Sequence, residues 1–187
     1  VTATTDASQV VFDETAPLAP AVSLFSNNGN PALAKVGDVV TLSFTVNEPL
    51  LGSPTVTIDG NATTIGGSYP SYTATYTMQA LDTEGVLAFT LNFTDAAGNA
   101  GLQVAATTDA SSVTFDQTAP LATAVTIFSN NALNTDRAKV GDIVTLSFTV
   151  NEPLIANPTV TIDGNAATIG GSNPNYTASY TTQTGDT

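Results

Sequence analysis

The chain has 187 residues, which is enough for one or two domains, and it contains no cysteine that could form a disulfide. Its three basic and sixteen acidic residues give a formal charge of −13, which disfavours nucleic acids and anionic membranes as partners and favours divalent cations. No run of eighteen apolar residues occurs, so we expect no membrane insertion in this segment. Histidine is absent too, and without the commonest general base or the best nucleophile we expect no enzyme activity.

The sequence Phe-Asp-Glu-Thr-Ala-Pro at residues 12–17 returns as Phe-Asp-Gln-Thr-Ala-Pro at residues 115–120. The two aspartates, Asp13 and Asp116, lie 103 residues apart, and the rest of the chain repeats with nearly the same spacing. A self-similar chain of this kind is built from copies of one structural unit. We therefore expect residues 1–12 to be the last strand of a preceding repeat, residues 13–115 to be one repeat, and residues 116–187 to be a second repeat that lacks its last two strands.

Apolar and polar residues alternate through most of the first repeat, and helical periodicity is absent. In residues 40–46, for example, every second side chain is apolar, which turns one face of a strand toward a core. The pattern predicts seven strands, at residues 20–26, 38–46, 54–59, 62–66, 71–79, 86–94 and 102–115. The predicted fold class is all-β, as tandem seven-stranded immunoglobulin-like Greek-key β-sandwiches of which the second is truncated.

Acidic residues are predicted to gather at one end of each sandwich. Because successive strands alternate in direction, the entering linker and the loops near residues 47 and 95 reach the same end. Crowded carboxylates without a basic neighbour need a counter-ion, and Ca²⁺ takes six to eight oxygen ligands from such loops. The alternative is that these acids are solvated turn residues that keep the protein soluble. The predicted Ca²⁺ ligands are Asp13, Glu14, Glu48, Asp95 and Asn99, with Asp116 and Glu152 at the second joint.

Other acidic and aromatic residues have simpler predicted roles. Aspartates at the opposite end, such as Asp38 and Asp82, are expected to cap their own turns, with a second bound ion as the alternative. Tyr72 falls in the inward register of its strand and is expected in the core. Tyr69 could stack on a sugar, but the corresponding residue of the second repeat is Asn173.

Three motifs together resemble bacterial immunoglobulin-like repeats. They are the Phe-Asp-x-Thr-Ala-Pro joint at 12–17, Lys-Val-Gly-Asp before a Val-Thr-Leu-Ser-Phe-Thr strand at 35–45, and Phe-Thr-Asp-Ala-Ala-Gly-Asn at 93–99; second copies of the first two stand at 115–120 and 139–149. Such repeats build large surface adhesins and secreted repeat proteins. The resemblance implies an extracellular location at the bacterial cell surface. It also implies calcium at Asp13, Asp95, Asn99 and Asp116, whereas Glu48 and Glu152 rest on the position of their loops.

We expect a structural spacer or stalk, because the loops of the two copies are nearly identical: residues 47–50 and 151–154 differ little. Its partners are then the neighbouring repeats of the same chain, with any host or cell-surface ligand bound by other parts of the protein. Two alternatives remain: a carbohydrate- or protein-binding module, and a fibre subunit that polymerises by strand addition. The second alternative follows from the unpaired strand edges that residues 1–12 and the truncated repeat are expected to expose.

Overall fold

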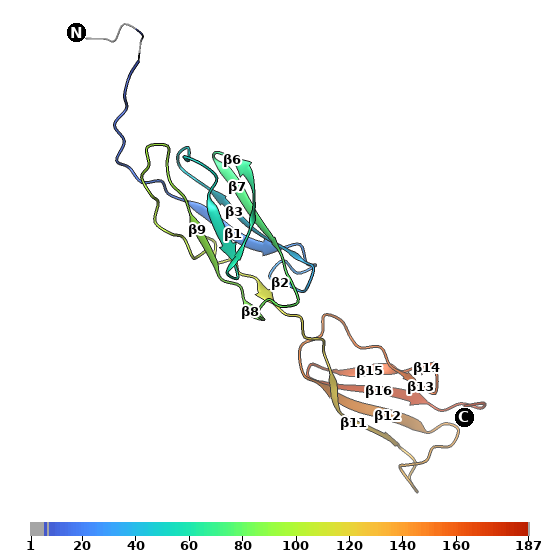
Figure 1. The fold of residues 1–187 in the computed structure, drawn as a ribbon. Coiled ribbons are helices and arrows are strands. Elements are labelled where there is room, and N and C mark those ends of the chain that lie inside the picture. Colours follow the sequence, from blue (N-terminus) through green and yellow to red (C-terminus); the bar gives the residue numbers. More distant parts are fainter. Residues whose placement is uncertain (1–5, 7, 187) are drawn as a thin grey trace. The chain divides into compact units, whose positions relative to one another are not determined.

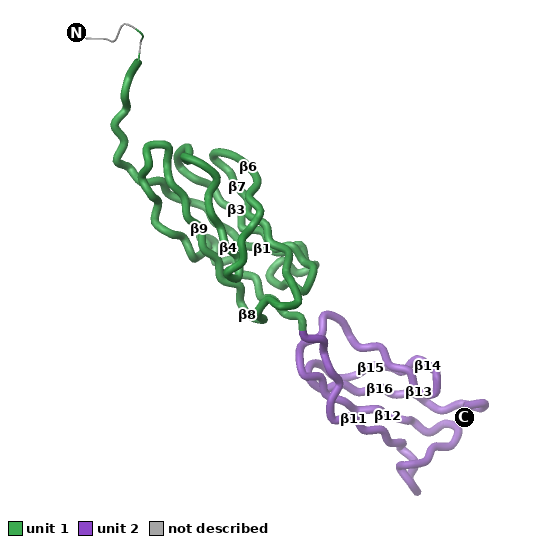
Figure 2. Tube along the Cα trace, viewed as in Figure 1, with its two compact units in different colours: residues 1–117 green, residues 118–187 purple. Residues whose placement is uncertain are grey.

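The computed structural model describes residue 6 and residues 8–186, and these residues form strands and loops without a helix (Figure 1). The all-β prediction is thereby confirmed. Within the same residues there is accordingly no helix long and apolar enough to cross a membrane. The chain divides into two compact units, Val1–Gln117 and Thr118–Thr187 (Figure 2). The strand predicted at residues 1–12 falls partly on residues 1–5 and 7, which lie outside the described residues.

One layer of unit 1 is a four-stranded antiparallel sheet in the order β1-β3-β7-β6. Along β3 the side chains of Val40, Leu42 and Phe44 are buried while the intervening residues are partly exposed, as the alternation in the sequence predicts. The ring of Tyr72 stacks on Phe44 with centroids 5.7 Å apart, so Tyr72 contacts the core as expected. The strands of this sheet are β1 (Ala21–Ser26), β3 (Val39–Thr45), β7 (Ser71–Thr77) and β6 (Thr64–Ser68).

The remaining strands of unit 1 form two three-stranded sheets, in the orders β5-β4-β9 and β2-β10-β8. Apolar side chains from these sheets and from the four-stranded sheet make one hydrophobic core, which gives the unit a β-sandwich-like structure. The strands are β5 (Asn61–Ala62), β4 (Thr55–Ile58), β9 (Phe89–Asn92), β2 (Leu33–Ala34), β10 (Thr114–Phe115) and β8 (Gly85–Val86).

The last predicted strand, at residues 102–115, is mostly irregular, so that part of the prediction is wrong. The segment first forms a bridge between Val104 and Leu91 on β9. It then crosses to β1, where the Thr108 N–H donates to the carbonyl of Val22 at 2.9 Å. It ends as β10, which pairs in parallel with β2 and antiparallel with β8. A segment that changes partner this often cannot hold one continuous ladder.

Unit 2 repeats the four-stranded sheet, in the order β11-β12-β16-β15. The turn that follows β4 also recurs: Asp59 and Asp163 both have φ of +50° and are followed by a glycine with positive φ. A short hairpin of β13 and β14 is the other sheet of this unit. The strands are β11 (Ala122–Ser129), β12 (Ile143–Val150), β13 (Thr161–Ile162), β14 (Asn165–Ala166), β15 (Thr168–Ser172) and β16 (Asn175–Thr181).

Candidate metal centre

Three acidic side chains of unit 1 come together although they are distant in the sequence. One carboxylate oxygen from each of Asp13, Glu48 and Asp95 lies within 4.8 Å of the other two. Asp13 precedes β1, Glu48 lies in the turn after β3, and Asp95 begins the turn after β9. The argument from strand direction thus predicted which loops meet. It is the one such group of acidic side chains in the described part of the chain.

Asp95 is the buried member of the group, and its own turn holds it in place. Its Oδ1 accepts hydrogen bonds from the backbone N–H groups of Ala97 (2.9 Å), Gly98 (2.7 Å) and Asn99 (2.8 Å), and its Oδ2 accepts one from Asn99 Nδ2 (2.8 Å). Burial pushes the pKa of Asp95 upward, but the hydrogen bonds from Asn99 and the turn outweigh it and leave the pKa lowered. Asp95 is therefore an ionised carboxylate in a fixed orientation, with Oδ2 less fully bonded than Oδ1.

Asn99 positions the segment that carries Asp13. Its Nδ2 donates to the backbone carbonyls of Asp13 (3.1 Å) and Thr15 (3.4 Å), as well as to Asp95. The amide nitrogen, which is not a metal ligand, thus faces the group. That Asn99 supplies an oxygen ligand stays a prediction. Its observed contacts are structural, because they attach the incoming segment to the turn after β9.

Asn47 makes a second attachment for the same segment. The Leu18 N–H donates to Asn47 Oδ1 at 2.7 Å, and the Asn47 N–H donates to the Leu18 carbonyl at 3.1 Å. This reciprocal pair fixes the turn that holds Glu48 against the segment that holds Asp13. Sequence reasoning placed Asn47 at this end of the unit but did not find its role. The recurrence of Asn-Glu-Pro at 151–153 was the available signal.

Glu48 is the member that its surroundings do not satisfy. Its Oε1 is buried and has no hydrogen-bond partner among the described residues. Burial, and then the negative charges of Asp13 and Asp95, raise the pKa of Glu48. A buried carboxylate oxygen without a partner is costly, so a group that satisfies it would stabilise the unit. The residues present therefore fit a bound cation. A cation coordinated by the Glu48 carboxylate would offset the negative charges of all three side chains.

The spacing of the oxygens also suits calcium. Ca²⁺ binds oxygen at roughly 2.3–2.6 Å, so two oxygens on the same ion are at most about 5 Å apart. The observed limit of 4.8 Å lies inside that range. Among the described residues, the one ion pair joins Lys139 to Asp142 in unit 2. No described lysine or arginine therefore pairs with Asp13, Glu48 or Asp95.

The other predicted ligands lie outside this group of three. Glu14 is exposed, and Asp116 lies at the end of unit 1, where its N–H donates to the Ala34 carbonyl at 2.9 Å. Glu152 of unit 2 repeats the situation of Glu48, since its Oε1 is buried without a partner. The preceding Asn151 again accepts a hydrogen bond through Oδ1, from the N–H of Leu121 at 2.7 Å.

The aspartates at the opposite end of unit 1 cap turns, as expected. Asp38 Oδ2 accepts hydrogen bonds from Asn28 Nδ2 (2.7 Å) and the Lys35 N–H (2.9 Å), and the Asn28 contact is the main reason that its pKa is lowered. Asp82 accepts hydrogen bonds from the Tyr76 hydroxyl at 3.0 Å and the Gln79 N–H at 2.7 Å. These carboxylates already have donors, and they form no metal-ligand group in the part of the chain that the structure describes.

Comparisons of the chain with protein family models, with curated proteins and with solved structures found no match.

Proposed function

We propose that this chain is a structural spacer from an extracellular bacterial adhesin or surface fibre, built from immunoglobulin-like repeats and stiffened by Ca²⁺ at the joint where the linker enters unit 1. The observation that carries the proposal is that Glu48, whose carboxylate groups with those of Asp13 and Asp95, has a buried Oε1 without a hydrogen-bond partner among the described residues. The tandem copies of one β unit and their nearly unchanged loops support the spacer role. The resemblance of three sequence motifs supports the extracellular location.

In this proposal the carboxylates of Asp13, Glu48 and Asp95 hold the ion. When bound, Ca²⁺ supplies positive charge and oxygen coordination, and it takes part in no reaction. Asp95 presents an oriented anion, Glu48 gains a partner for its buried oxygen, and Asp13 ties the entering segment to both turns. Asn47 and Asn99 already fasten that segment through hydrogen bonds, so the ion would reinforce an existing attachment.

A stiffened attachment is what a stalk needs. Each repeat must transmit force along the chain, and the segment before β1 is where that force enters unit 1. Without the ion, the three carboxylates repel one another and favour release of this segment. With the ion, release would have to break coordination bonds as well as the hydrogen bonds from the two asparagines.

The decisive experiment is thermal unfolding of the chain in about 10 mM CaCl₂ and in excess chelator. For sites of extracellular type, with Kd on the order of 0.1–1 mM, this concentration stabilises a protein by about 1.4–2.7 kcal/mol. The melting temperature of unit 1 should then rise by roughly 6 °C or more. Equal MgCl₂ serves as a control for ionic strength and for ion type.

Two variants make the result specific. Glu48→Gln keeps the side-chain size and should abolish the calcium-dependent rise. Asp136→Asn removes one negative charge from an exposed residue of unit 2 and should leave the rise intact. Equal melting temperatures in calcium and chelator for the unmodified chain would refute the calcium proposal, and so would a full rise in Glu48→Gln.

A further inference from the structure

Two turns in the chain hold an asparagine in nearly the same way. One follows β1 in unit 1, and the other follows β11 in unit 2. Asn28 Nδ2 donates to Asp38 Oδ2 at 2.7 Å, and Asn131 Nδ2 donates to Asp142 Oδ2 at 3.0 Å. The Oδ1 of each asparagine accepts a hydrogen bond from the backbone N–H two residues further on, at 3.1 Å and 3.0 Å. Both asparagines are half-buried, so their surroundings match.

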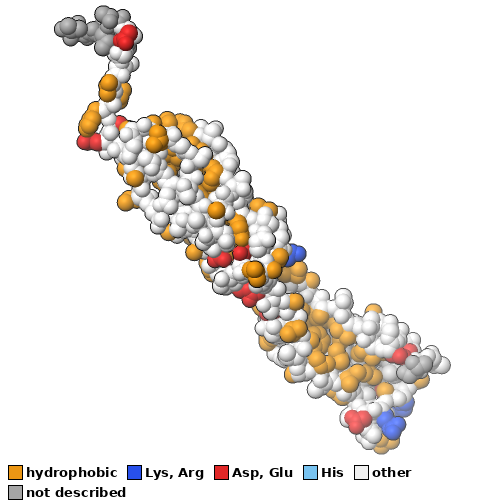
Figure 3. Space-filling view, viewed as in Figure 1, with side chains coloured by type: hydrophobic (Ala, Val, Ile, Leu, Met, Phe, Trp, Pro, Cys, Tyr) orange, Lys and Arg blue, Asp and Glu red, His pale blue; other side chains and the backbone are white. Residues whose placement is uncertain are grey.

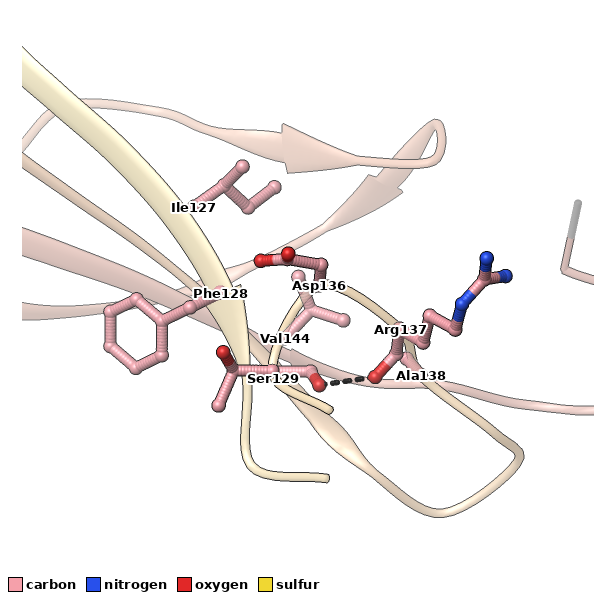
Figure 4. Close-up of a pocket in the computed structure, with 8 residues that line it drawn as sticks. Ile127, Phe128, Ser129, Asp136, Arg137, Ala138 and Val144 are labelled. Atoms are coloured by element: carbon pink, nitrogen blue, oxygen red, sulfur yellow. Dashed lines mark hydrogen bonds between the residues drawn. The ribbon is translucent and has the colours of Figure 1, made fainter. Parts of the chain in front are cut away.

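A serine at the end of the preceding strand fixes the backbone before each asparagine. Ser26 Oγ accepts a hydrogen bond from the Asn28 N–H at 2.9 Å, and Ser129 Oγ accepts one from the Asn131 N–H at 3.2 Å. Figure 4 shows the further hydrogen bond that Ser129 Oγ donates to the Arg137 carbonyl in the unit 2 turn. The chain on the N-terminal side of the two asparagines is therefore held alike, and the difference lies on the C-terminal side.

The residue that follows the asparagine is not the same in the two turns. Asn28 precedes Gly29 and Asn131 precedes Ala132, and the chain contains no other Asn-Gly sequence. Gly29 is exposed, and a Cβ built on it would meet no atom within 4 Å. Its N–H donates no hydrogen bond to any residue that the structure describes. The Gly29 nitrogen is therefore unhindered and has no hydrogen bond to give up before it reacts.

These features favour loss of the Asn28 side-chain amide without an enzyme. The Gly29 nitrogen gives its proton to hydroxide and attacks Asn28 Cγ, and the bond from Cγ to Nδ2 breaks as ammonia leaves. Water then opens the resulting succinimide at either carbonyl, which gives aspartate or isoaspartate. One water is consumed, one ammonia is released, and nothing is oxidised or reduced. The Asn30 N–H, which donates to Asn28 Oδ1, stabilises the negative charge that gathers on this oxygen during the attack.

We propose that Asn28 is a site of spontaneous deamidation, and that the reaction weakens unit 1 at the turn between β1 and β2. Asn131 resists the same reaction, because the Cβ of Ala132 hinders the approach of its nitrogen to Asn131 Cγ, whereas glycine has no Cβ. The two repeats then differ in chemical lifetime at one equivalent position. The inference goes beyond the proposed function and needs no calcium, so its test is made in excess chelator.

Deamidation removes a donor on which Asp38 depends. The hydrogen bond from Asn28 is the main reason that the pKa of Asp38 is lowered, and the product places a second carboxylate beside it. Lys35 is the one basic residue in residues 1–117, and Figure 3 shows that basic side chains are sparse on the visible face. The turn leads to β2, which pairs in parallel with β10. Repulsion between the two carboxylates therefore destabilises this part of unit 1 and leaves unit 2 unchanged.

The test is incubation of the chain at mildly alkaline pH, followed by tryptic digestion and mass spectrometry. Cleavage after Lys35 and Arg137 places Asn28 and Asn131 in different peptides, and fragmentation locates each new acid. A sample taken before incubation corrects for deamidation during digestion. Asn28 should react about tenfold faster than Asn131 or more, which corresponds to a difference of about 1.4 kcal/mol in activation free energy.

Exchanging the following residues tests the cause. Gly29→Ala gives the unit 1 turn the sequence of its counterpart and should slow Asn28 to the rate of Asn131, with stability unchanged because the new Cβ meets no atom. Ala132→Gly should raise the rate at Asn131 to that of Asn28. Rates that follow the exchanged residue in both directions would show that the glycine, and not the surrounding turn, sets the reactivity.

Asn28→Asp reproduces the aspartate product and tests the consequence. Its melting temperature for unit 1 should fall, while the protected amides of β12 and β16 in unit 2 keep their exchange rates. The proposal is overturned if Asn28 reacts no faster than Asn131, if either exchange leaves the rate of its asparagine unchanged, or if Asn28→Asp is as stable as the unmodified chain. None of these results bears on the calcium-dependent rise, so the two proposals fail separately.

Discussion

Phe12 and Phe115 occupy the same place in the repeated motif but lie in opposite surroundings. Phe115 is fully buried in the core of unit 1, and Phe12 projects into solvent. Truncating each to alanine therefore compares one chemical change in two environments. We expect Phe115→Ala to destabilise unit 1 strongly and Phe12→Ala to leave the stability of the monomer unchanged.

The magnitude follows from the burial of the ring. A buried phenylalanine removes about 150–250 Å² from water, which at about 25 cal/mol per Å² corresponds to roughly 4–6 kcal/mol. That figure is an upper bound, because the unfolded chain already buries some of this area and alanine retains part of the contact. Measured Phe→Ala changes in cores cost about 3–5 kcal/mol, and we expect about 4 kcal/mol for Phe115→Ala.

Native-state amide hydrogen exchange separates unit 1 from unit 2, because the protected amides of β3 and β7 report on unit 1 alone. Their free energies of opening should fall by about 4 kcal/mol in Phe115→Ala and by less than about 0.5 kcal/mol in Phe12→Ala. Phe115→Leu is a milder substitution for the case in which alanine prevents folding. Equal effects of the two alanine substitutions would show that the β10 segment does not complete the core.

Four further outcomes test the site and the turns. Asp95 has a lowered pKa, so its ionised form stabilises the folded state above pH 3.8, and this stabilisation is lost as pH falls through the folded pKa. In urea titrations at a series of pH values, Asp95→Asn should therefore reduce the loss of unfolding free energy at acid pH. Glu48 has a raised pKa, so without calcium the stability should fall as pH rises from 4.5 through its folded pKa, and Glu48→Gln should remove this dependence. Isothermal titration should give one calcium ion per chain, and Glu152→Gln should not change that number. Gly67→Ala should destabilise unit 1 by about 1–2 kcal/mol or more in urea unfolding, because φ is +82° and the new Cβ would lie 2.4 Å from the Ser71 carbonyl oxygen. As the control, Gly29→Ala should be nearly neutral, because its new Cβ would meet no atom within 4 Å.

The strands that could be predicted are those in which apolar and polar residues alternate because one face of the strand packs on the core along its whole length. Residues 38–46 alternate because one face of β3 packs on the core, and the observed strand covers residues 39–45. Residues 102–115 also contain apolar residues, but their partners change from β9 to β1 and then to β2. Such changes depend on long-range packing, which the local pattern does not encode.

The same distinction applies to the site. Strand direction alone brought the loops of Asp13, Glu48 and Asp95 to one end, because that depends only on the order of strands and turns. It could not predict that Asn99 would turn its amide nitrogen toward the entering segment. Nor could it exclude Glu14, which follows Asp13 directly but lies outside the group. Side-chain orientation within a loop depends on hydrogen bonds that only the folded structure shows.

The comparison of Glu48 with Glu152 identifies what makes the group in unit 1 distinctive. Both glutamates follow an asparagine that accepts a hydrogen bond from the incoming segment, and both have a buried Oε1 without a partner. The unsatisfied oxygen is therefore a property of the Asn-Glu-Pro turn, and crowding by other carboxylates does not create it. What unit 1 adds is Asp13 and the fixed anion of Asp95, which convert one costly oxygen into a set that a hard cation can satisfy.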